Sequence, residues 1–232
     1  FDKEFVKYAC EQSLHRLGTD YIDLYQAHNI KLEELQRDEL FETLEQLQFE
    51  GKIRYFGVAL GPDIGWFEEG EYSMRERDID SAQIIYSILE QDPAKDLIRL
   101  AEEHGVGLLS RVPHASNTLT GEYDRGLPVF DADDHRAHRK NEWLTDAMKK
   151  VDRVRFLIQD DARTMAQSAI QFVLKQPAII SVLPNFTKLS EIEEYTSALE
   201  TPEITDEEQA KLDELWDNGF DIAEPEPQFR EI

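Results

Sequence analysis

The sequence predicts an α/β fold of the (β/α)8-barrel type, in which parallel strands alternate with covering helices. Short runs rich in β-branched and aromatic residues alternate with longer runs of helical periodicity, an order typical of parallel sheets. No GxGxxG motif follows any strand-like run, which disfavours a doubly wound dinucleotide-binding sheet. We count five strand-like runs, whereas a closed barrel needs eight. We therefore expect the first three strand-helix units to be missing from this chain.

The first expected helix precedes the first expected strand. Apolar residues recur at near-helical spacing from Phe5 to Leu17, and Gly18 can adopt the left-handed conformation that favours a helix end. The run YIDLYQAH at 21–28 follows directly and is typical of a buried strand.

The same order then repeats along the chain. Leucines from Leu35 to Leu47 lie on one helix face, with Gly51 near the helix end, and IRYFGVAL is the next expected strand. The remaining expected strands are SAQIIYS at 81–87, VGLLSRV at 106–112 and AIISVLP at 178–184. Further helices are expected over 95–104, 162–175 and 207–216.

We expect one domain over residues 1–232, interrupted by a long insertion at 113–150. Turn residues such as Gly121 and Pro128 and a polar run break the strand-helix rhythm in this segment. A long excursion after a barrel strand is where a substrate loop would lie, although an exposed insertion without function fits the composition equally well.

The insertion also contains donor types that bind divalent metals. They are Asp131, Asp133, Asp134, His135 and His138. Because the aspartates are typical of ordinary loop solvation, we predict no metal site.

Composition narrows the partners and the compartment. The chain has 49 acidic and 25 basic residues and a net charge of −24, which disfavours binding to nucleic acid. Its one cysteine, Cys10, cannot form an intrachain disulfide and fits a reducing compartment. There is no apolar run long enough for a membrane span and no signal-peptide pattern. We expect an acidic cytoplasmic protein.

One segment resembles a known family. SLHRLGTDYIDLYQAHN at 13–29 is similar to the signature of aldo-keto reductases, in which a helix ending in Leu-Gly leads into a strand ending in His. The resemblance continues through GKIRYFGVA at 51–59, Gln83, RVPHASNTLTGEY at 111–123 and VLPNFTKLSEIEE at 182–194. It implies a barrel of the aldo-keto reductase type that begins here just before its fourth strand.

The resemblance implies reduction of an aldehyde or ketone with NAD(P)H. The family uses a tetrad of Asp, Tyr, Lys and His, and His28 corresponds to the histidine that polarises the carbonyl. In the family the other three residues precede this strand. We therefore expect them upstream of Phe1 and expect the chain alone to be inactive.

Four family positions concern the nicotinamide. Gln83 corresponds to the glutamine that binds the carboxamide, a group that needs both a donor and an acceptor. The family's usual Ser-Asn pair is replaced by Ala59 and Leu60, so those two contacts are expected to be lost or moved. Arg111 stands where an aromatic residue normally stacks on the nicotinamide. A guanidinium can stack and reach the pyrophosphate, and it can equally form a simple ion pair.

The family's pyrophosphate-wrapping positions correspond to Pro113, Ser116 and Asn117.

The loop from Asn185 to Lys188 corresponds to the adenosine phosphate site, at the start of a helix whose N-terminus can hold an anion. Lys188 is the only base in this loop, and Glu191 and Glu194 would repel a 2′-phosphate. NADP(H) is the family's expectation, and NAD(H) stays open.

Two other functions remain open from the sequence alone. A nicotinamide-binding regulatory subunit of the same fold would bind the cofactor without turnover. An unrelated barrel enzyme, such as an isomerase or aldolase, would not bind it. In the leading interpretation the partner is a small-molecule carbonyl compound.

Overall fold

The computed structural model describes residues 1–61, 66–130 and 141–222. The chain forms two compact units. Unit 1 contains residues 1–85, 92–110 and 177–181, and unit 2 contains residues 86–91, 111–176 and 182–232.

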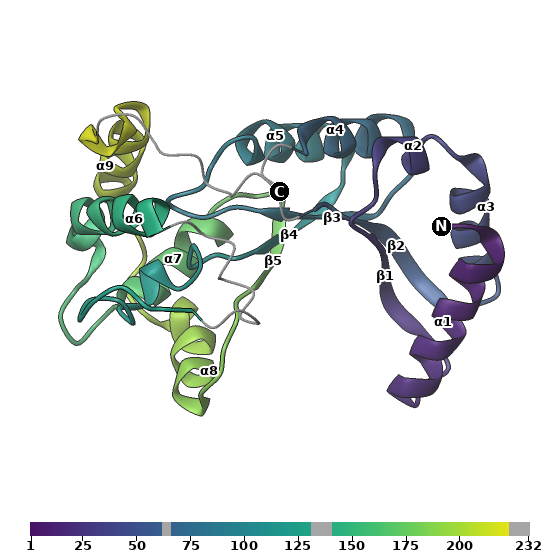
Figure 1. Cartoon of the computed structure of the whole chain (residues 1–232), viewed down its shortest axis with the longest axis horizontal. Coiled ribbons are helices and arrows are strands. Elements are labelled where there is room, and N and C mark those ends of the chain that lie inside the picture. The colour runs from purple at the N-terminus through teal and green to yellow at the C-terminus, as the bar shows by residue number, and fades with distance from the viewer. Residues whose placement is uncertain (62–65, 131–140, 223–232) are drawn as a thin grey trace. The chain divides into compact units, whose positions relative to one another are not determined.

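The described strands form one five-stranded sheet whose order follows the chain (Figure 1). They are β1 (Ile22–His28), β2 (Ile53–Ala59), β3 (Ser81–Ile85), β4 (Gly107–Arg111) and β5 (Ile179–Leu183). β2 pairs in parallel with both β1 and β3. The α/β class and all five predicted strands are confirmed.

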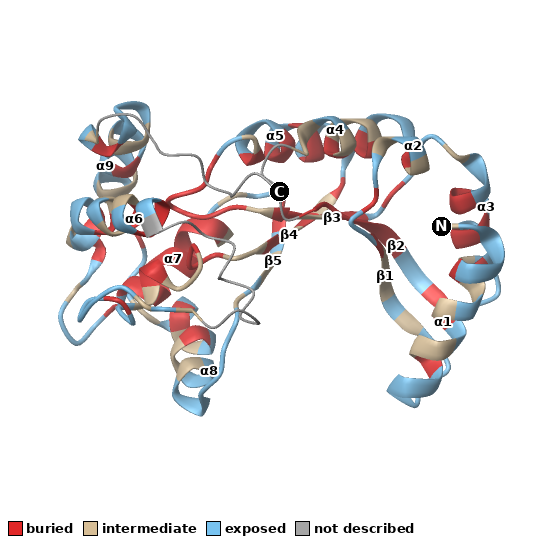
Figure 2. Ribbon diagram, in the orientation of Figure 1, coloured by how far each residue is buried: buried red, intermediate tan, exposed pale blue. Residues whose placement is uncertain are grey.

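The helices of unit 1 lie against this sheet. They are α1 (Lys3–Leu17), α2 (Leu32–Leu35), α3 (Asp38–Phe49), α4 (Phe67–Glu76) and α5 (Ala94–His104). Asp2 caps α1 by accepting a hydrogen bond from the Phe5 N–H, and Gly18 ends it in the predicted left-handed conformation with a φ of 68°. The leucines of α3 are buried, as the predicted apolar face requires (Figure 2).

Unit 2 is largely helical. Its helices are α6 (Asn141–Val154), α7 (Met165–Leu174), α8 (Leu189–Thr196) and α9 (Asp206–Asp217), with 3-10 turns η1 (Thr118–Thr120), η3 (Arg155–Leu157), η4 (Ser197–Glu200) and η5 (Gly219–Asp221). Helix α7 is buried over almost its whole length. Thr164 and Thr205 cap α7 and α9 through capping boxes with Gln167 and Glu208.

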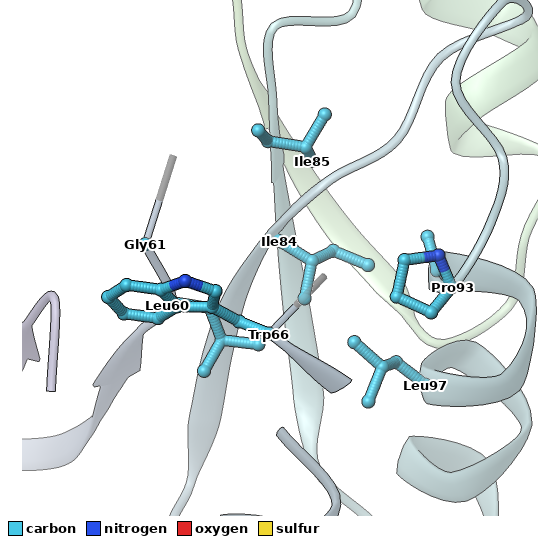
Figure 3. Close-up of a pocket in the computed structure, with 8 residues that line it drawn as sticks. Leu60, Gly61, Trp66, Ile84, Ile85, Pro93 and Leu97 are labelled. Carbon is cyan, nitrogen blue, oxygen red and sulfur yellow. The ribbon is translucent and has the colours of Figure 1, made fainter. Parts of the chain in front are cut away.

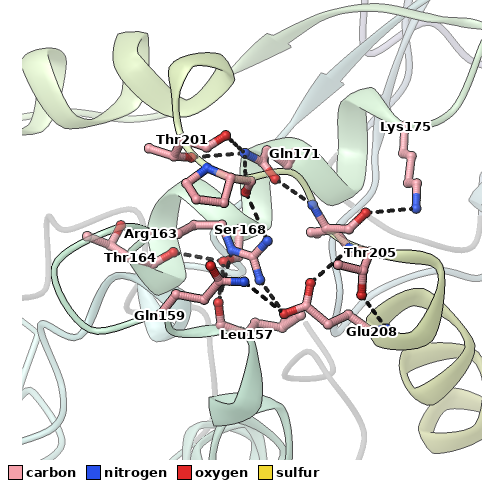
Figure 4. A network of polar contacts seen from close by, with 12 residues as sticks. Leu157, Gln159, Arg163, Thr164, Ser168, Gln171, Lys175, Thr201, Thr205 and Glu208 are labelled. Carbon is pink, nitrogen blue, oxygen red and sulfur yellow. Dashed lines mark hydrogen bonds and ion pairs between the residues drawn. The ribbon is translucent and has the colours of Figure 1, made fainter.

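A buried arginine connects α9 to the segment before α7 (Figure 4). The guanidinium of Arg163 donates hydrogen bonds to the carbonyl oxygens of Leu157 and Pro202, and it pairs with the Glu208 carboxylate at 2.5 Å. Arg163 is fully buried, so each of its partners would lose a hydrogen bond in a dry environment if the guanidinium were removed. This network serves the structure of unit 2.

Two helices differ from the sequence-based expectation. Helix α4 was not predicted, and α6 begins inside the segment 113–150 that we interpreted as an insertion. The acids and histidines considered as metal donors at 131–138 lie outside the described residues. Within the described ranges, no three metal-donor side chains gather. The helices of those ranges are too short or too polar to cross a membrane.

Candidate active site

His28 and Gln83 lie in one row across the sheet of unit 1. The parallel register pairs His28 of β1 with Ala59 of β2, and Ala59 with Gln83 of β3. Residues in register on parallel strands point to the same face. The carboxyl ends of parallel strands are where α/β proteins place their active sites. The two residues singled out from the sequence therefore share a face and an end of the sheet.

A second polar row lies two residues earlier in β1. Gln26 is in register with Gly57, and Gly57 with Ser81. The Gln26 amide nitrogen donates to the Val58 carbonyl oxygen at 3.3 Å and to the Ser81 hydroxyl at 3.2 Å. Its amide oxygen accepts a hydrogen bond from the Gln83 amide nitrogen at 3.3 Å. The two rows are thus joined through Gln26.

Gly57 makes this crossing possible. A Cβ at position 57 would lie 2.0 Å from the Ser81 carbonyl oxygen and 2.5 Å from its hydroxyl oxygen, far inside van der Waals contact. With no side chain in the middle of the row, the long Gln26 side chain reaches from β1 to β3. The row requires glycine for space, not for a special backbone conformation.

A small apolar pocket lies beyond the ends of β2 and β3 (Figure 3). Its lining includes Leu60, Trp66, Ile84 and Leu97, and the Lys31 ammonium lies 3.3 Å from the centre of the Trp66 ring. The cavity measures about 20 Å³, room for little more than one water molecule. In this form it is too small to hold a carbonyl substrate.

In unit 2, the chain leaves β4 through strained backbone. Val112, Ala115, Ser116 and Asn117 all have positive φ, between 45° and 69°. Such values are uncommon for residues with side chains and rare for a β-branched one, and they concentrate at functional sites. Directly before this run, burial lowers the pKa of the half-buried Arg111 guanidinium.

His114 fixes this loop to the helices of unit 2. Its ring nitrogen Nε2 lies 3.2 Å from the Ala166 carbonyl oxygen of α7, and its ring packs on Tyr195 of α8 with centroids 4.5 Å apart. Burial lowers the pKa of His114 to about 4, so the ring is neutral at neutral pH and its Nε2–H donates to the carbonyl. Pro113 is buried beside it, and the backbone carbonyl oxygen of Ser116 accepts a hydrogen bond from the Tyr123 hydroxyl.

At the start of α8, backbone N–H groups bind a carboxylate of the same helix. The Glu191 carboxylate accepts hydrogen bonds from the backbone N–H groups of Thr187 and Lys188, at 2.7 and 3.1 Å. The Lys188 ammonium lies 3.2 Å from the same carboxylate, and Asn185 is exposed just before this turn. Two backbone donors at this helix start and the Lys188 ammonium are therefore already bound to Glu191.

Sequence reasoning missed two residues of these arrangements, Gln26 and His114. Gln26 lies two positions before His28, so strand alternation alone would have put it on the same face. Within unit 2, Arg111 ends β4 and Pro113 and Ser116 belong to the loop that follows it, whereas Asn185 and Lys188 belong to the loop after β5.

Comparison with known proteins identifies the family of this chain. The aldo/keto reductase family model matches residues 1–217. An uncharacterized oxidoreductase, YqkF of Bacillus subtilis, is 31% identical over 209 residues, covering 89% of this chain and 64% of that protein. The L-glyceraldehyde 3-phosphate reductase of Escherichia coli is 27% identical over 230 residues, covering 94% and 64%. The chain thus spans 64% of the length of these curated relatives.

A solved structure agrees with the sequence matches. The holo form of the aldo-keto reductase AKR11C1 from Bacillus halodurans has a TM-score of 0.70 and 28% identity, covering 92% of this chain and 67% of that one. The family match spans almost the whole chain and gives no support to the expectation that three strand-helix units are missing. The predicted barrel type and the family resemblance are confirmed, and the chain belongs to the aldo/keto reductase family.

Proposed function

We propose that this protein reduces an aldehyde or ketone to an alcohol with a nicotinamide cofactor. The observation that carries the proposal is the shared register row of His28, at the end of β1, and Gln83 of β3. Family membership supports the reaction class. The E. coli relative is named a reductase of L-glyceraldehyde 3-phosphate, which is a carbonyl compound.

The side chain of Gln83 fits the carboxamide of a nicotinamide. Its amide nitrogen gives one hydrogen to Gln26, and among the described residues its amide oxygen has no hydrogen-bond partner. One N–H and the oxygen are then available for a group that has both an acceptor and donors. When bound, the reduced nicotinamide supplies the hydride.

His28 has the properties of a group that polarises a carbonyl. Its side chain is exposed at the end of β1, where a substrate oxygen can reach it. A hydrogen bond from an imidazole N–H stabilises the negative charge that develops on this oxygen as hydride arrives at carbon. We assign no proton donor among the residues of this chain.

The residues that we propose as contacts to the cofactor phosphates are compatible with both NADP(H) and NAD(H). Arg111, Pro113 and Ser116 are our proposed contacts to the pyrophosphate, and Asn185 and Lys188 to the adenosine end. Because Glu191 already binds Lys188, a 2′-phosphate has to compete with a carboxylate for the same donors. We propose that NADP(H) and NAD(H) both serve, with a smaller preference for NADP(H) than a free lysine would give.

The remaining assignments follow from the sequence. We propose the segment 113–150 as the substrate loop; among its described residues are η1 and the first part of α6. We propose the cytoplasm as the compartment, because the single Cys10 needs no oxidising environment.

The test is a turnover assay with the purified full-length protein. Absorbance of NADPH or NADH should fall when glyceraldehyde is added, and His28→Ala should lower kcat by about 10²-fold, the scale of a lost polarising group. His15→Ala, at an exposed position of α1, is the matched control and should leave kcat unchanged.

Each other outcome has a distinct meaning. Unchanged kcat in His28→Ala would remove His28 from the reaction. Cofactor binding without turnover on any carbonyl compound would favour the regulatory subunit, and no cofactor binding would favour an unrelated barrel enzyme.

A further inference from the structure

The amide groups of Gln26 and Gln83 form a chain with a fixed direction. A backbone carbonyl can only accept hydrogen bonds, so Gln26 must turn its NH2 group toward the Val58 carbonyl oxygen, 3.3 Å away. The Ser81 hydroxyl takes a second hydrogen of the same NH2 group at 3.2 Å. The Gln26 amide oxygen is thereby directed away from both partners and toward Gln83.

The orientation of the Gln26 amide also fixes the orientation of the Gln83 amide. With the Gln26 oxygen facing it at 3.3 Å, Gln83 must present its own NH2 group on that side. Rotating the Gln83 amide by half a turn would place two amide oxygens against each other and lose a hydrogen bond. The Gln83 amide oxygen is therefore held on the side away from Gln26.

Burial keeps this direction well defined. Ser81 is only 3% exposed, and the missing side chain at Gly57 lets Gln26 span β2. Gln26 and Gln83 are half-buried, so water competes weakly for their hydrogen bonds. A free glutamine side chain would lose rotamer freedom on binding a ligand, whereas this one is already ordered.

We infer that Gln26 is a positioning residue for the cofactor. It fixes the amide of Gln83 in the single orientation that offers an acceptor oxygen and one N–H to a nicotinamide carboxamide. Gln26 acts through Gln83 and does not itself touch the ligand. This inference rests on the proposed function.

The test is a double-mutant cycle read by calorimetric titration with NADPH and, in parallel, NADH. Gln26→Leu should weaken binding by about 5- to 20-fold, the range of one or two neutral hydrogen bonds. Gln83→Leu should weaken it at least as much, and adding Gln26→Leu to Gln83→Leu should cost nothing further. ADP-ribose lacks the nicotinamide ring, so its affinity should be the same in all four proteins.

Gln46→Leu is the matched control. Gln46 is exposed on α3 and its amide nitrogen donates to Glu50, outside the chain of Gln26 and Gln83, so affinity for NADPH should stay within about twofold of the unaltered protein. If circular dichroism shows that Gln26→Leu is not folded, Gln26→Met replaces it in the cycle.

The outcomes separate the two claims. No binding of NADPH or NADH by the unaltered protein would overturn the proposed function, and this inference with it. Binding by the unaltered protein with additive losses in the cycle, or with an equal loss of ADP-ribose affinity, would overturn the role of Gln26 alone.

Discussion

Lys188 and Glu191 form an ion pair across the first turn of α8, with nitrogen and oxygen 3.2 Å apart. Hydrogen bonds from the Thr187 N–H, and then from the side chain and N–H of Lys188, hold the pKa of Glu191 below its ordinary value. The carboxylate is therefore charged at neutral pH. It occupies the backbone donors at the start of this helix, where an anion is favoured.

The first prediction concerns cofactor preference. Glu191→Gln should raise affinity for NADPH relative to NADH by about 3- to 10-fold, because it removes one negative charge at a partly screened site. A glutamine can still accept from the backbone N–H groups, so the helix start is kept. Fluorescence titration with both cofactors measures the ratio. Glu193→Gln, at an exposed position of the same helix, should leave the ratio unchanged.

The second prediction concerns Lys188 itself. Lys188→Ala should weaken NADPH binding by about 1 to 2 kcal/mol and leave NADH binding nearly unchanged, as expected for a charge-assisted contact to the 2′-phosphate. The same titration measures both. Equal losses for the two cofactors would show that Lys188 does not contact the 2′-phosphate.

The third prediction concerns pH and His114. Burial lowers its folded-state pKa from 6.5 to about 4, so only the unfolded chain gains a proton between these values. Its contribution to stability is present above pH 6.5 and is lost as pH falls toward 4. Between pH 6.5 and 5 the free energy of unfolding should fall by about 1 to 2 kcal/mol through this residue.

Urea unfolding at several pH values measures this loss. His114→Gln should remove that part of the pH dependence, whereas His104→Gln, at an exposed position, should keep it. Identical pH profiles for the unaltered protein and His114→Gln would contradict the neutral, buried state of His114.

The fourth prediction concerns Gly57. Gly57→Ala should lower the free energy of unfolding by about 2 kcal/mol or more, because its Cβ meets backbone atoms of Ser81 that cannot move without parting β2 from β3. Urea denaturation measures the change. An unchanged urea midpoint in Gly57→Ala would contradict this prediction, because it would mean that β2 and β3 can separate locally at little cost in free energy.

The fifth prediction concerns the buried arginine of unit 2. Arg163→Met should destabilise by about 3 to 5 kcal/mol, since it leaves the Glu208 carboxylate and two carbonyl groups without their donor. The exposed pair of Arg155 and Asp152 is the matched comparison, and Asp152→Asn should cost less than about 1 kcal/mol. Comparable losses in both variants would contradict the structural role of Arg163.

Much of the fold could be predicted from local pattern. The strand runs at 21–28 and 53–60 are short, rich in β-branched, aromatic and leucine residues, and each follows a glycine near a helix end; all five strands form where the pattern predicts them. Helix α4 was not predicted because its sequence, FEEGEYSMRE, has a glycine near its centre and few apolar residues. A Cβ at Gly70 would lie 2.7 Å from a terminal methyl group of Leu97, so glycine favours close packing of α4 on α5, a contact that no local pattern contains.

The candidate site could be predicted only in part from the sequence. His28 could be found because motif and strand end coincide there, and Gln83 because its strand and its place in the family pattern were both recognisable. The hydrogen bonds that orient Gln83 depend on the register of three strands, which periodicity does not give. Glu191 was recognised as an unfavourable charge, but its bonds to the first turn of α8 require the loop conformation.

The left-handed run after β4 has a consequence for protein engineering. Glycine at Val112, Ala115, Ser116 or Asn117 would relieve the folded backbone, yet it would also give the unfolded chain more conformations to lose. Because these positions carry side chains, the unbound loop already has fewer conformations than a glycine loop would have. It therefore loses less conformational entropy when a ligand binds. Glycine substitutions here should therefore shift ligand association toward a less favourable entropy, even where the melting temperature rises.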